Sequence, residues 1–286
     1  MTKLSNHISI DQATGTIDYG FRNDYMFRAV LQENKNALIG LVSSLLHLNP
    51  TDIQSIDIQN PIELGKSIDN KEFILDIAIL LNDNSYINLE MQVNNHHNWP
   101  ERSLSYLCRS FDQLNRGEAY ADTKPVLHIG FLDYTPFPDA PEFYATYDMR
   151  NIKTHHPYCS KFAISVVDLT QIANATNEDK AYGIDQWAAL FKATTWEEIR
   201  MITKNNKFLT DASNTLYKLN SEDMIRQQCE ARERAEIEDR YLLNQISSLM
   251  AENNKKDAVI TEKDHTIAEK DRIIANLMAQ LEKKNS

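Results

Sequence analysis

The sequence predicts an α/β (α+β) core built around a mixed sheet, followed by a helical region and a long terminal helix. Helical and strand-like patterns alternate between residues 20 and 170, whereas residues 178–220 show helical patterns alone. The end of the chain is highly charged and carries a seven-residue apolar repeat. We therefore expect four parts: a poorly ordered lead at 1–20, a core at 21–175, a helical extension at 176–221 and a long helix or coiled coil at 222–286.

The composition is that of a globular protein in a reducing cytoplasm. Of 286 residues, 42% are hydrophobic and 25% are charged, which argues against wholesale disorder. The three cysteines lie far apart without a Cys-x-x-Cys spacing, which favours neither a disulfide framework nor a cysteine zinc site. No apolar run approaches the ~18 residues of a membrane span, and the N-terminus lacks a signal-peptide pattern, so we expect a cytoplasmic protein without membrane association.

The net charge of −11 argues against one class of nucleic-acid-binding protein. Proteins that coat nucleic acids neutralise phosphates with surplus Lys and Arg, whereas this chain has 30 basic and 41 acidic residues. An enzyme that acts on DNA remains compatible with this charge, because a carboxylate metal site is itself acidic until its cation binds.

Residues 20–170 supply the elements of the predicted core. Apolar residues recur at three-to-four spacing between Asn23 and Leu46, which predicts a helix ended by Asn49-Pro50. The predicted strands or extended segments are 51–64, 73–81, 86–93, 125–133, 143–149 and 162–169, and a helix opened by Pro100 runs to about residue 115. In the extension, Thr195-Trp-Glu-Glu198 matches a capping box at the start of a helix.

Two neighbouring strands carry the residues that suggest chemistry. Asp76 interrupts an apolar strand, and Glu90 and Gln92 lie two apart in the next one. A buried strand rarely carries a carboxylate, because an isolated charge away from water is costly unless it is paired or binds a metal. Alternation puts Asn88, Glu90 and Gln92 on one face. If the strands form a hairpin, the carboxylates of Asp76 and Glu90, the carbonyl of Met91 and waters would suit a small hard cation such as Mg²⁺.

The register of this hairpin decides whether the acidic groups meet. A two- or four-residue turn places Asp76 opposite Met91. A three-residue loop at 83–85 places Asp76 opposite Gln92, with Glu90 on the diagonal. The metal interpretation therefore requires a three-residue loop or a bulge.

An alternative interpretation of these carboxylates leaves the metal out. Asp76 and Glu90 would then each pair with a basic side chain, for example Lys71 or Arg102. The spacing alone favours neither interpretation.

Five short motifs in a fixed order give the chain a family resemblance. They are Asn23-Asp-Tyr-Met-Phe-Arg28, Lys71-x-x-x-Leu-Asp76-Ile, Leu89-Glu-Met-Gln92, Arg102-Ser-Leu-Ser-Tyr106 with Gln113-Leu-x-x-Gly117-x-x-Tyr120, and Pro125-Val-Leu-His-Ile-Gly-Phe-Leu. Over about residues 20–235 the chain resembles the PD-(D/E)XK nuclease superfamily, and more narrowly its recombination-promoting nuclease/transposase family. The resemblance implies a restriction-endonuclease-like mixed sheet flanked by helices.

The resemblance also implies a metal-dependent phosphodiesterase that acts on DNA. Asp76 and Glu90 would hold Mg²⁺, for which Mn²⁺ would substitute, and Gln92 stands where the superfamily motif usually has a lysine. A lysine stabilises transition-state charge, whereas a glutamine only hydrogen-bonds and orients. Charge stabilisation would then fall to the metal and to a basic residue, with Lys71 and Arg102 as candidates. Water activated by the metal would be the nucleophile.

Two further motif residues are candidates for substrate contact. Asp24 matches an aspartate of the opening motif, but the helix macrodipole also favours an aspartate at that position. Tyr106 either contacts substrate or packs in the core.

Residues 242–281 carry a heptad repeat that predicts pairing with a second chain. One seam is Ile246, Asn253, Ile260, Ile267, Ile274 and Leu281, and the other is Leu242, Leu249, Lys256, Lys263, Lys270 and Leu277. Ile with a single Asn in one seam favours a parallel two-stranded coil, and the lysines in the other weaken it. We therefore expect a homodimer or higher oligomer, with a lone solvated helix as the alternative.

Two functions are compatible with this sequence. The first is a Mg²⁺-dependent DNA endonuclease whose coiled coil brings two active sites into one assembly, by analogy with nucleases that cut both strands. The second is a catalytically weak or inactive nuclease-fold protein that acts as a binding or assembly module through its coil. The missing lysine, the acidic charge and the helical tail fit the second function.

Overall fold

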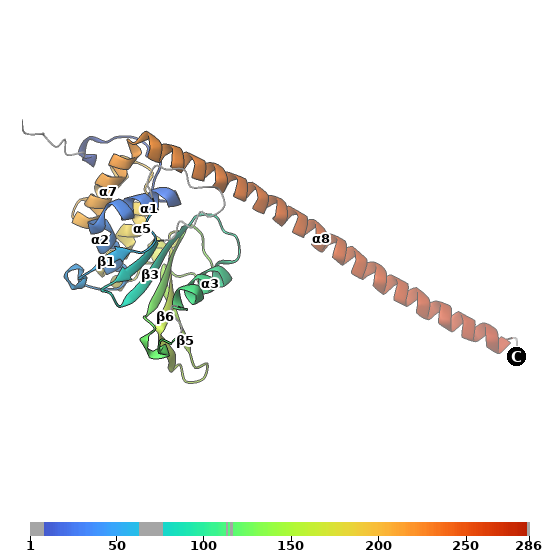
Figure 1. Ribbon diagram of the computed structural model, residues 1–286. Coiled ribbons are helices and arrows are strands. Elements are labelled where there is room, and N and C mark those ends of the chain that lie inside the picture. Colours follow the sequence, from blue (N-terminus) through green and yellow to red (C-terminus); the bar gives the residue numbers. More distant parts are fainter. Residues whose placement is uncertain (1–8, 63–76, 113, 115–116, 285–286) are drawn as a thin grey trace, which may run out of the picture. The chain divides into compact units, whose positions relative to one another are not determined.

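The computed structural model describes residues 9–62, 77–112, 114 and 117–284 (Figure 1). The chain divides after Arg234 into two compact units. The first unit contains a mixed six-stranded sheet with flanking helices, and the second is part of one long helix. The predicted fold class, a mixed sheet with flanking helices and a long terminal helix, is confirmed.

The sheet has the strand order β1-β2-β3-β4-β6-β5. The strands are β1 (Ile56–Ile58), β2 (Ile77–Leu81), β3 (Ser85–Gln92), β4 (Val126–Leu132), β5 (Tyr144–Arg150) and β6 (Pro157–Asp168). β3, β4 and β6 run parallel in the centre, and the β1–β2, β2–β3 and β5–β6 pairs are antiparallel. Of the predicted strand at 73–81, residues 73–76 lie outside the described residues.

Helices lie on both faces of this sheet (Figure 1). α1 (Asp24–Glu33), α2 (Lys35–Leu45), α5 (Ile184–Lys192) and α7 (Lys207–Asn220) pack together over one face, with the shorter α4 (Asn177–Ala181) and α6 (Trp196–Thr203) beside them. α3 (Trp99–Phe111) contacts β4 and β6 from the other face. The last helix, α8, runs from Asp223 to Lys284.

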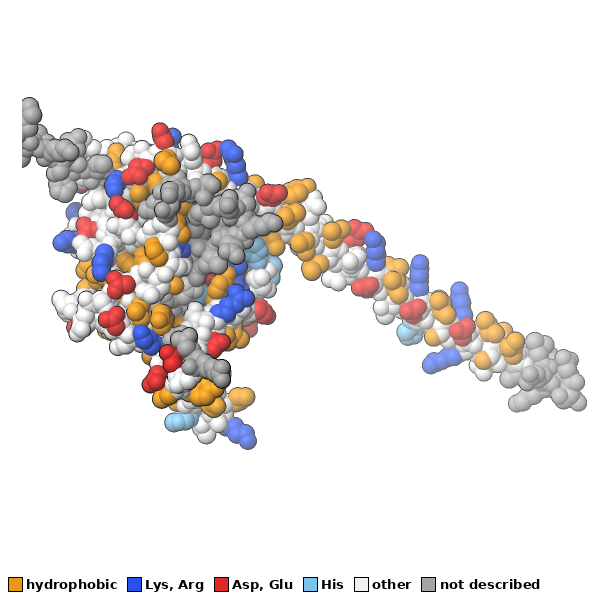
Figure 2. All heavy atoms as spheres, viewed as in Figure 1, with side chains coloured by type: hydrophobic (Ala, Val, Ile, Leu, Met, Phe, Trp, Pro, Cys, Tyr) orange, Lys and Arg blue, Asp and Glu red, His pale blue; other side chains and the backbone are white. Residues whose placement is uncertain are grey.

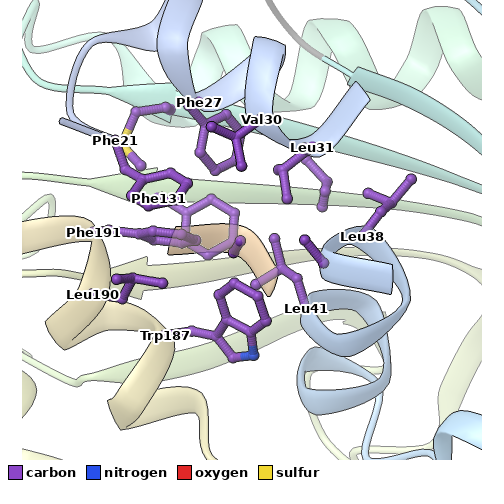
Figure 3. Close-up of a cluster of buried hydrophobic side chains, with 14 of the residues drawn as sticks. Phe21, Phe27, Val30, Leu31, Leu38, Leu41, Phe131, Trp187, Leu190 and Phe191 are labelled. Atoms are coloured by element: carbon purple, nitrogen blue, oxygen red, sulfur yellow. The ribbon is translucent and has the colours of Figure 1, made fainter. Parts of the chain in front are cut away.

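The main core lies between the sheet and the α1 side (Figure 3). Phe131 of β4 has its ring centroid 5.5 Å from that of Phe27 and 5.2 Å from that of Phe191. The odd-numbered side chains of β3, Ile87, Leu89 and Met91, are buried in the same cluster. Strand alternation therefore turns the even-numbered side chains of β3 toward the α3 side.

The predicted helix between Asn23 and Leu46 is two helices divided at Asn34. The Asn34 side chain caps α2 by accepting a hydrogen bond of 3.0 Å from the Ala37 amide. Its amide nitrogen donates to the Asp211 carbonyl and to the Thr215 hydroxyl of α7. The apolar periodicity continues across this break, so it did not reveal the cap.

A three-residue loop joins β2 and β3, but it begins one residue earlier than predicted. Leu81 pairs with Ser85, and both Asn82 (φ 49°) and Asp83 (φ 54°) adopt the left-handed conformation that Asn and Asp tolerate. The Asn82 side-chain oxygen also accepts hydrogen bonds from the amides of Gln54 and Ser55. These bonds hold Asn82 in the loop, which sets the register at Ile77 opposite Leu89.

The helical extension shares its core with the sheet and with part of the predicted lead. Ile10 is buried, and Thr16 forms an isolated bridge with Thr195. The predicted capping box is confirmed, because the Thr195 hydroxyl accepts from the Glu198 amide and the Glu198 carboxylate accepts from the Thr195 amide. No helix among the described residues is both long enough and apolar enough to cross a membrane.

Candidate functional site

The α3 side of the central strands carries a polar group of side chains. Asn88, Glu90 and Gln92 follow each other on one face of β3, and each is at most 7% exposed. The parallel pairing with β4 sets Glu90 opposite Gly130. Gln92 is the last residue of β3, so this group lies at the carboxyl end of the parallel strands, where open α/β sheets bind their ligands.

Glu90 is held by an arginine from α3. The Nε and Nη2 atoms of Arg102 both lie 2.8 Å from Glu90 Oε1, and the guanidinium stands 5.2 Å from the centroid of the Tyr106 ring. Of the two interpretations of Glu90, pairing with a basic residue is therefore observed, and Arg102 is that residue. Tyr106 is half-buried, and its ring forms a cation–π contact with the Arg102 guanidinium.

A buried histidine faces the second oxygen of Glu90. His128 of β4 is completely buried, and its Nε2 lies 3.5 Å from Glu90 Oε2. Burial opposes ionisation of Glu90, but the contact with His128 and the charge of Arg102 outweigh it and lower the pKa of the carboxyl. Glu90 is consequently a carboxylate at neutral pH. Sequence reasoning missed His128, because the contact depends on which strand lies beside β3.

Several oxygen atoms of this group are buried without a hydrogen-bond partner. Among the described residues, Asn88 Oδ1, Glu90 Oε2 and Gln92 Oε1 have none. Carboxylate and amide oxygens are the ligands that Mg²⁺ prefers. Orphaned buried oxygens are costly, so their presence along one strand face fits a bound cation. The described residues contain no cluster of three or more His, Cys, Asp or Glu side chains that would hold a metal unaided.

Tyr134, which sequence reasoning also missed, contributes a phenol beside this group. Burial raises the pKa of its hydroxyl, the charge of Glu90 raises it further, and Arg102 opposes the shift. Tyr134 therefore keeps its proton at neutral pH and remains a hydrogen-bond donor. Its position just beyond β4 gave no sequence signal, since aromatic residues next to strands usually pack in a core.

Two predicted site residues, Asp76 and Lys71, lie outside the described residues. Met91, whose carbonyl was a predicted ligand, turns its side chain into the core on the opposite face from Glu90. The contribution of these three residues to a metal site stays a prediction.

Asp24 forms an ion pair with an arginine of α8. It is the first residue of α1, and Arg232 Nε lies 2.9 and 2.7 Å from its two carboxylate oxygens. The neighbouring Asn23 caps α1 and donates a hydrogen bond of 3.0 Å to the Cys229 carbonyl. The opening motif thus holds the first turns of α8 against the start of α1, within the first unit. Contact of Asp24 with substrate stays a prediction.

A comparison with protein families identifies the family of the chain. The family model described as "PD-(D/E)XK nuclease family transposase" matches residues 21–245. The chain belongs to this family. The predicted family resemblance is thereby confirmed, and a nuclease-like function on DNA is the family's general character. No curated protein and no solved structure matches the chain.

The match of the PD-(D/E)XK nuclease family transposases extends over the sheet, the helical extension and the first turns of α8. Within this range, the Asn23 and Asp24 contacts join the start of α1 to the first turns of α8. Nucleases of the PD-(D/E)XK type generally use divalent metals, which agrees with the buried oxygen atoms without a partner on the β3 face.

Proposed function

We propose that this chain is a Mg²⁺-dependent DNA endonuclease, with Mn²⁺ able to replace Mg²⁺. The observation that carries the proposal is Glu90, a buried carboxylate whose Oε2 has no hydrogen-bond partner among the described residues. It lies beside the similarly orphaned Gln92 Oε1, in a chain of the PD-(D/E)XK nuclease family transposases.

Asp76 is the proposed second carboxylate ligand. It directly precedes Ile77, the first residue of β2, and Ile77 lies opposite Leu89, the neighbour of Glu90. The carbonyl of Met91 is the proposed third ligand. A bound divalent cation would supply Lewis acidity and would lower the pKa of the attacking water toward neutral pH.

The side chains around Glu90 have separate proposed roles. Gln92 orients a water or a phosphate oxygen by hydrogen bonding. It cannot stabilise charge as a lysine would, because its amide is neutral. Arg102 is partly exposed and can leave Glu90 for a substrate phosphate, to which its planar guanidinium is suited. Lys71 is a further candidate for this charge, and the Tyr134 phenol is a donor next to Glu90.

Substitution of Glu90 tests this function. Glu90→Gln keeps the shape of the side chain and removes its charge, so we expect plasmid cleavage in Mg²⁺ to fall about 100-fold or more. Asp76→Ala should have a comparable effect. The matched control is Glu101→Gln, which changes an exposed carboxylate on the same helix as Arg102. Cleavage by Asp76→Ala at the rate of the parent protein would contradict the proposal.

The second candidate function is an inactive nuclease fold that assembles through its last helix. The apolar side chains that α8 exposes favour it (Figure 2), among them Ile246, Ile260, Ile267 and Ile274, each about half exposed. Calorimetry with Mn²⁺ separates the two functions. An inactive scaffold should bind no Mn²⁺, whereas the nuclease should bind it in a manner that Asp76→Ala abolishes.

Pairing with a second copy is also part of the proposed function. We place it at residues 242–281, where the heptad seams fall on one helix without a break. Such pairing would bring two sites together on one DNA duplex, which suits a nuclease that cuts both strands.

A further inference from the structure

The polar atoms around His128 specify where its ring proton lies. Asn88 Nδ2 lies 3.0 Å from His128 Nδ1, and an amide nitrogen only donates, so Nδ1 accepts this hydrogen bond. The proton of the neutral ring is then on Nε2. That nitrogen faces Glu90 Oε2 at 3.5 Å, where an N–H group is favourable and a lone pair is repelled.

The surrounding structure fixes the ring in this position. Parallel pairing sets Asn88 directly opposite His128. The Tyr106 ring stacks on the imidazole, with 6.0 Å between the ring centroids and an interplanar angle of 8°. The Trp99 ring centroid lies 5.5 Å from that of the imidazole. Trp99 in turn lies over Gly130, where even a methyl group would come within 2.1 Å of the indole ring. The imidazole is fully buried and has little room to turn.

His128 and Arg102 therefore restrain Glu90 in different ways. Arg102 reaches Oε1 from the surface, with 40% of its side chain exposed, and it can move to a phosphate. His128 reaches Oε2 from the interior and cannot leave. The contact of 3.5 Å is longer than an ideal hydrogen bond, and neither of its two atoms has another hydrogen-bond partner among the described residues.

We propose that His128 is a positioning residue for Glu90, and that Asn88 fixes the tautomer in which His128 can play this part. The inference rests on the proposed function, because it treats Glu90 as the metal ligand. A carboxylate oxygen has two lone pairs. His128 restrains one lone pair of Oε2 and leaves the other for the cation, and interactions of this kind behind a ligand typically change metal affinity 10–100-fold.

Two substitutions at His128 separate positioning from simple packing. His128→Gln retains a side-chain N–H group at a reach similar to that of Nε2, whereas His128→Leu fills the space without a donor. We expect the Leu variant to bind Mn²⁺ about 10–100-fold more weakly by calorimetry, and the Gln variant to stay within about threefold of the parent. The matched control is His156→Leu, at an exposed histidine. Equal loss in the Leu and Gln variants, or no loss in either, overturns the inference.

A second pair of measurements keeps the test decisive if the Leu variant folds poorly. Asn88→Leu leaves His128 in place but removes the donor to Nδ1, so we expect an intermediate loss of Mn²⁺ affinity and, because a buried ring nitrogen loses its partner, a lower unfolding midpoint. Nitrogen NMR of the parent protein should show His128 protonated on Nε2, and a proton on Nδ1 alone overturns the inference without reference to metal. A parent protein that has the Nε2–H tautomer and binds no Mn²⁺ contradicts the proposed function, and with it the positioning role that rests on it.

Discussion

At the scale of single residues, the charge of Glu90 couples stability to pH. Its pKa is lowered in the folded protein, so its ionic contacts stabilise the fold fully above its ordinary value of 4.5 and are lost as the pH falls through the lower folded value. We expect Glu90→Gln to be less stable than the parent at pH 7 by on the order of 1 kcal/mol, because solvent partly screens Arg102. Urea unfolding in EDTA at pH 7 and at about pH 3.5 should show this difference shrinking in acid. A difference that stays constant contradicts the shift.

Arg102 provides a second test at this scale. Arg102→Gln removes a cation that competes with the metal for Glu90, so Mn²⁺ affinity should be retained within a few fold. Cleavage should nevertheless fall about 10–100-fold, because the cation that we propose for the reacting phosphate is lost. Calorimetry and plasmid cleavage on the same preparation measure the two effects. If Mn²⁺ affinity and cleavage fell by the same factor, Arg102 would act only by holding Glu90 in place.

The sequence predicted single residues well where alternation alone decided their place. Asn88, Glu90 and Gln92 share one strand face because side chains alternate, and this needs no knowledge of neighbouring strands. His128 required the strand order, since it meets Glu90 only because β4 lies parallel beside β3. No local pattern encodes that neighbour, so the sequence alone did not single out this histidine.

At the scale of elements, Gly130 shows how strand and helix set the site together. Trp99 at the start of α3 lies against Gly130, so Gly130→Ala should force the indole away and cost about 1–3 kcal/mol of stability. Gly20→Ala is the matched control, because a methyl group there meets its nearest atom at an ordinary 3.6 Å. Urea unfolding compares the two variants. Equal stability of both would mean that α3 moves freely over β4.

Element boundaries were harder to predict than element types, for physical reasons that two asparagines illustrate. Asn34 ends one helix and begins another within an unbroken apolar pattern, because its partners come from α7. Asn82 begins the β2–β3 loop one residue early, because the amides of Gln54 and Ser55 bind its side chain. Both boundaries are set by partners distant in the sequence, whereas the capping box at Thr195 is local and was predicted correctly.

At the scale of the whole molecule, the charge pattern of α8 bears on the proposed pairing. Each lysine of the second seam is followed by an aspartate, in the pairs Lys256-Asp257, Lys263-Asp264 and Lys270-Asp271. In a parallel coil a seam side chain packs between four residues of the facing helix, which include its own counterpart and the following position. Each lysine would then meet the aspartate of the second chain, which compensates for its place in the seam. The lysines that weaken an apolar seam thus favour the parallel, in-register pair of two identical chains.

Substitutions in the full chain test this pairing. Ile260→Asp with Ile267→Asp places like charges against each other in the seam, so we expect the double variant to be a monomer by light scattering, where the parent has twice the mass of one chain. The control is Ala258→Asp, which adds one negative charge on the outer side of the helix and should leave the mass of the parent unchanged. Mn²⁺ affinity should be equal in all three proteins, because Glu90 belongs to the first unit. A parent protein that is monomeric at micromolar concentration would contradict the pairing while leaving the metal site intact, since the two proposals rest on different residues.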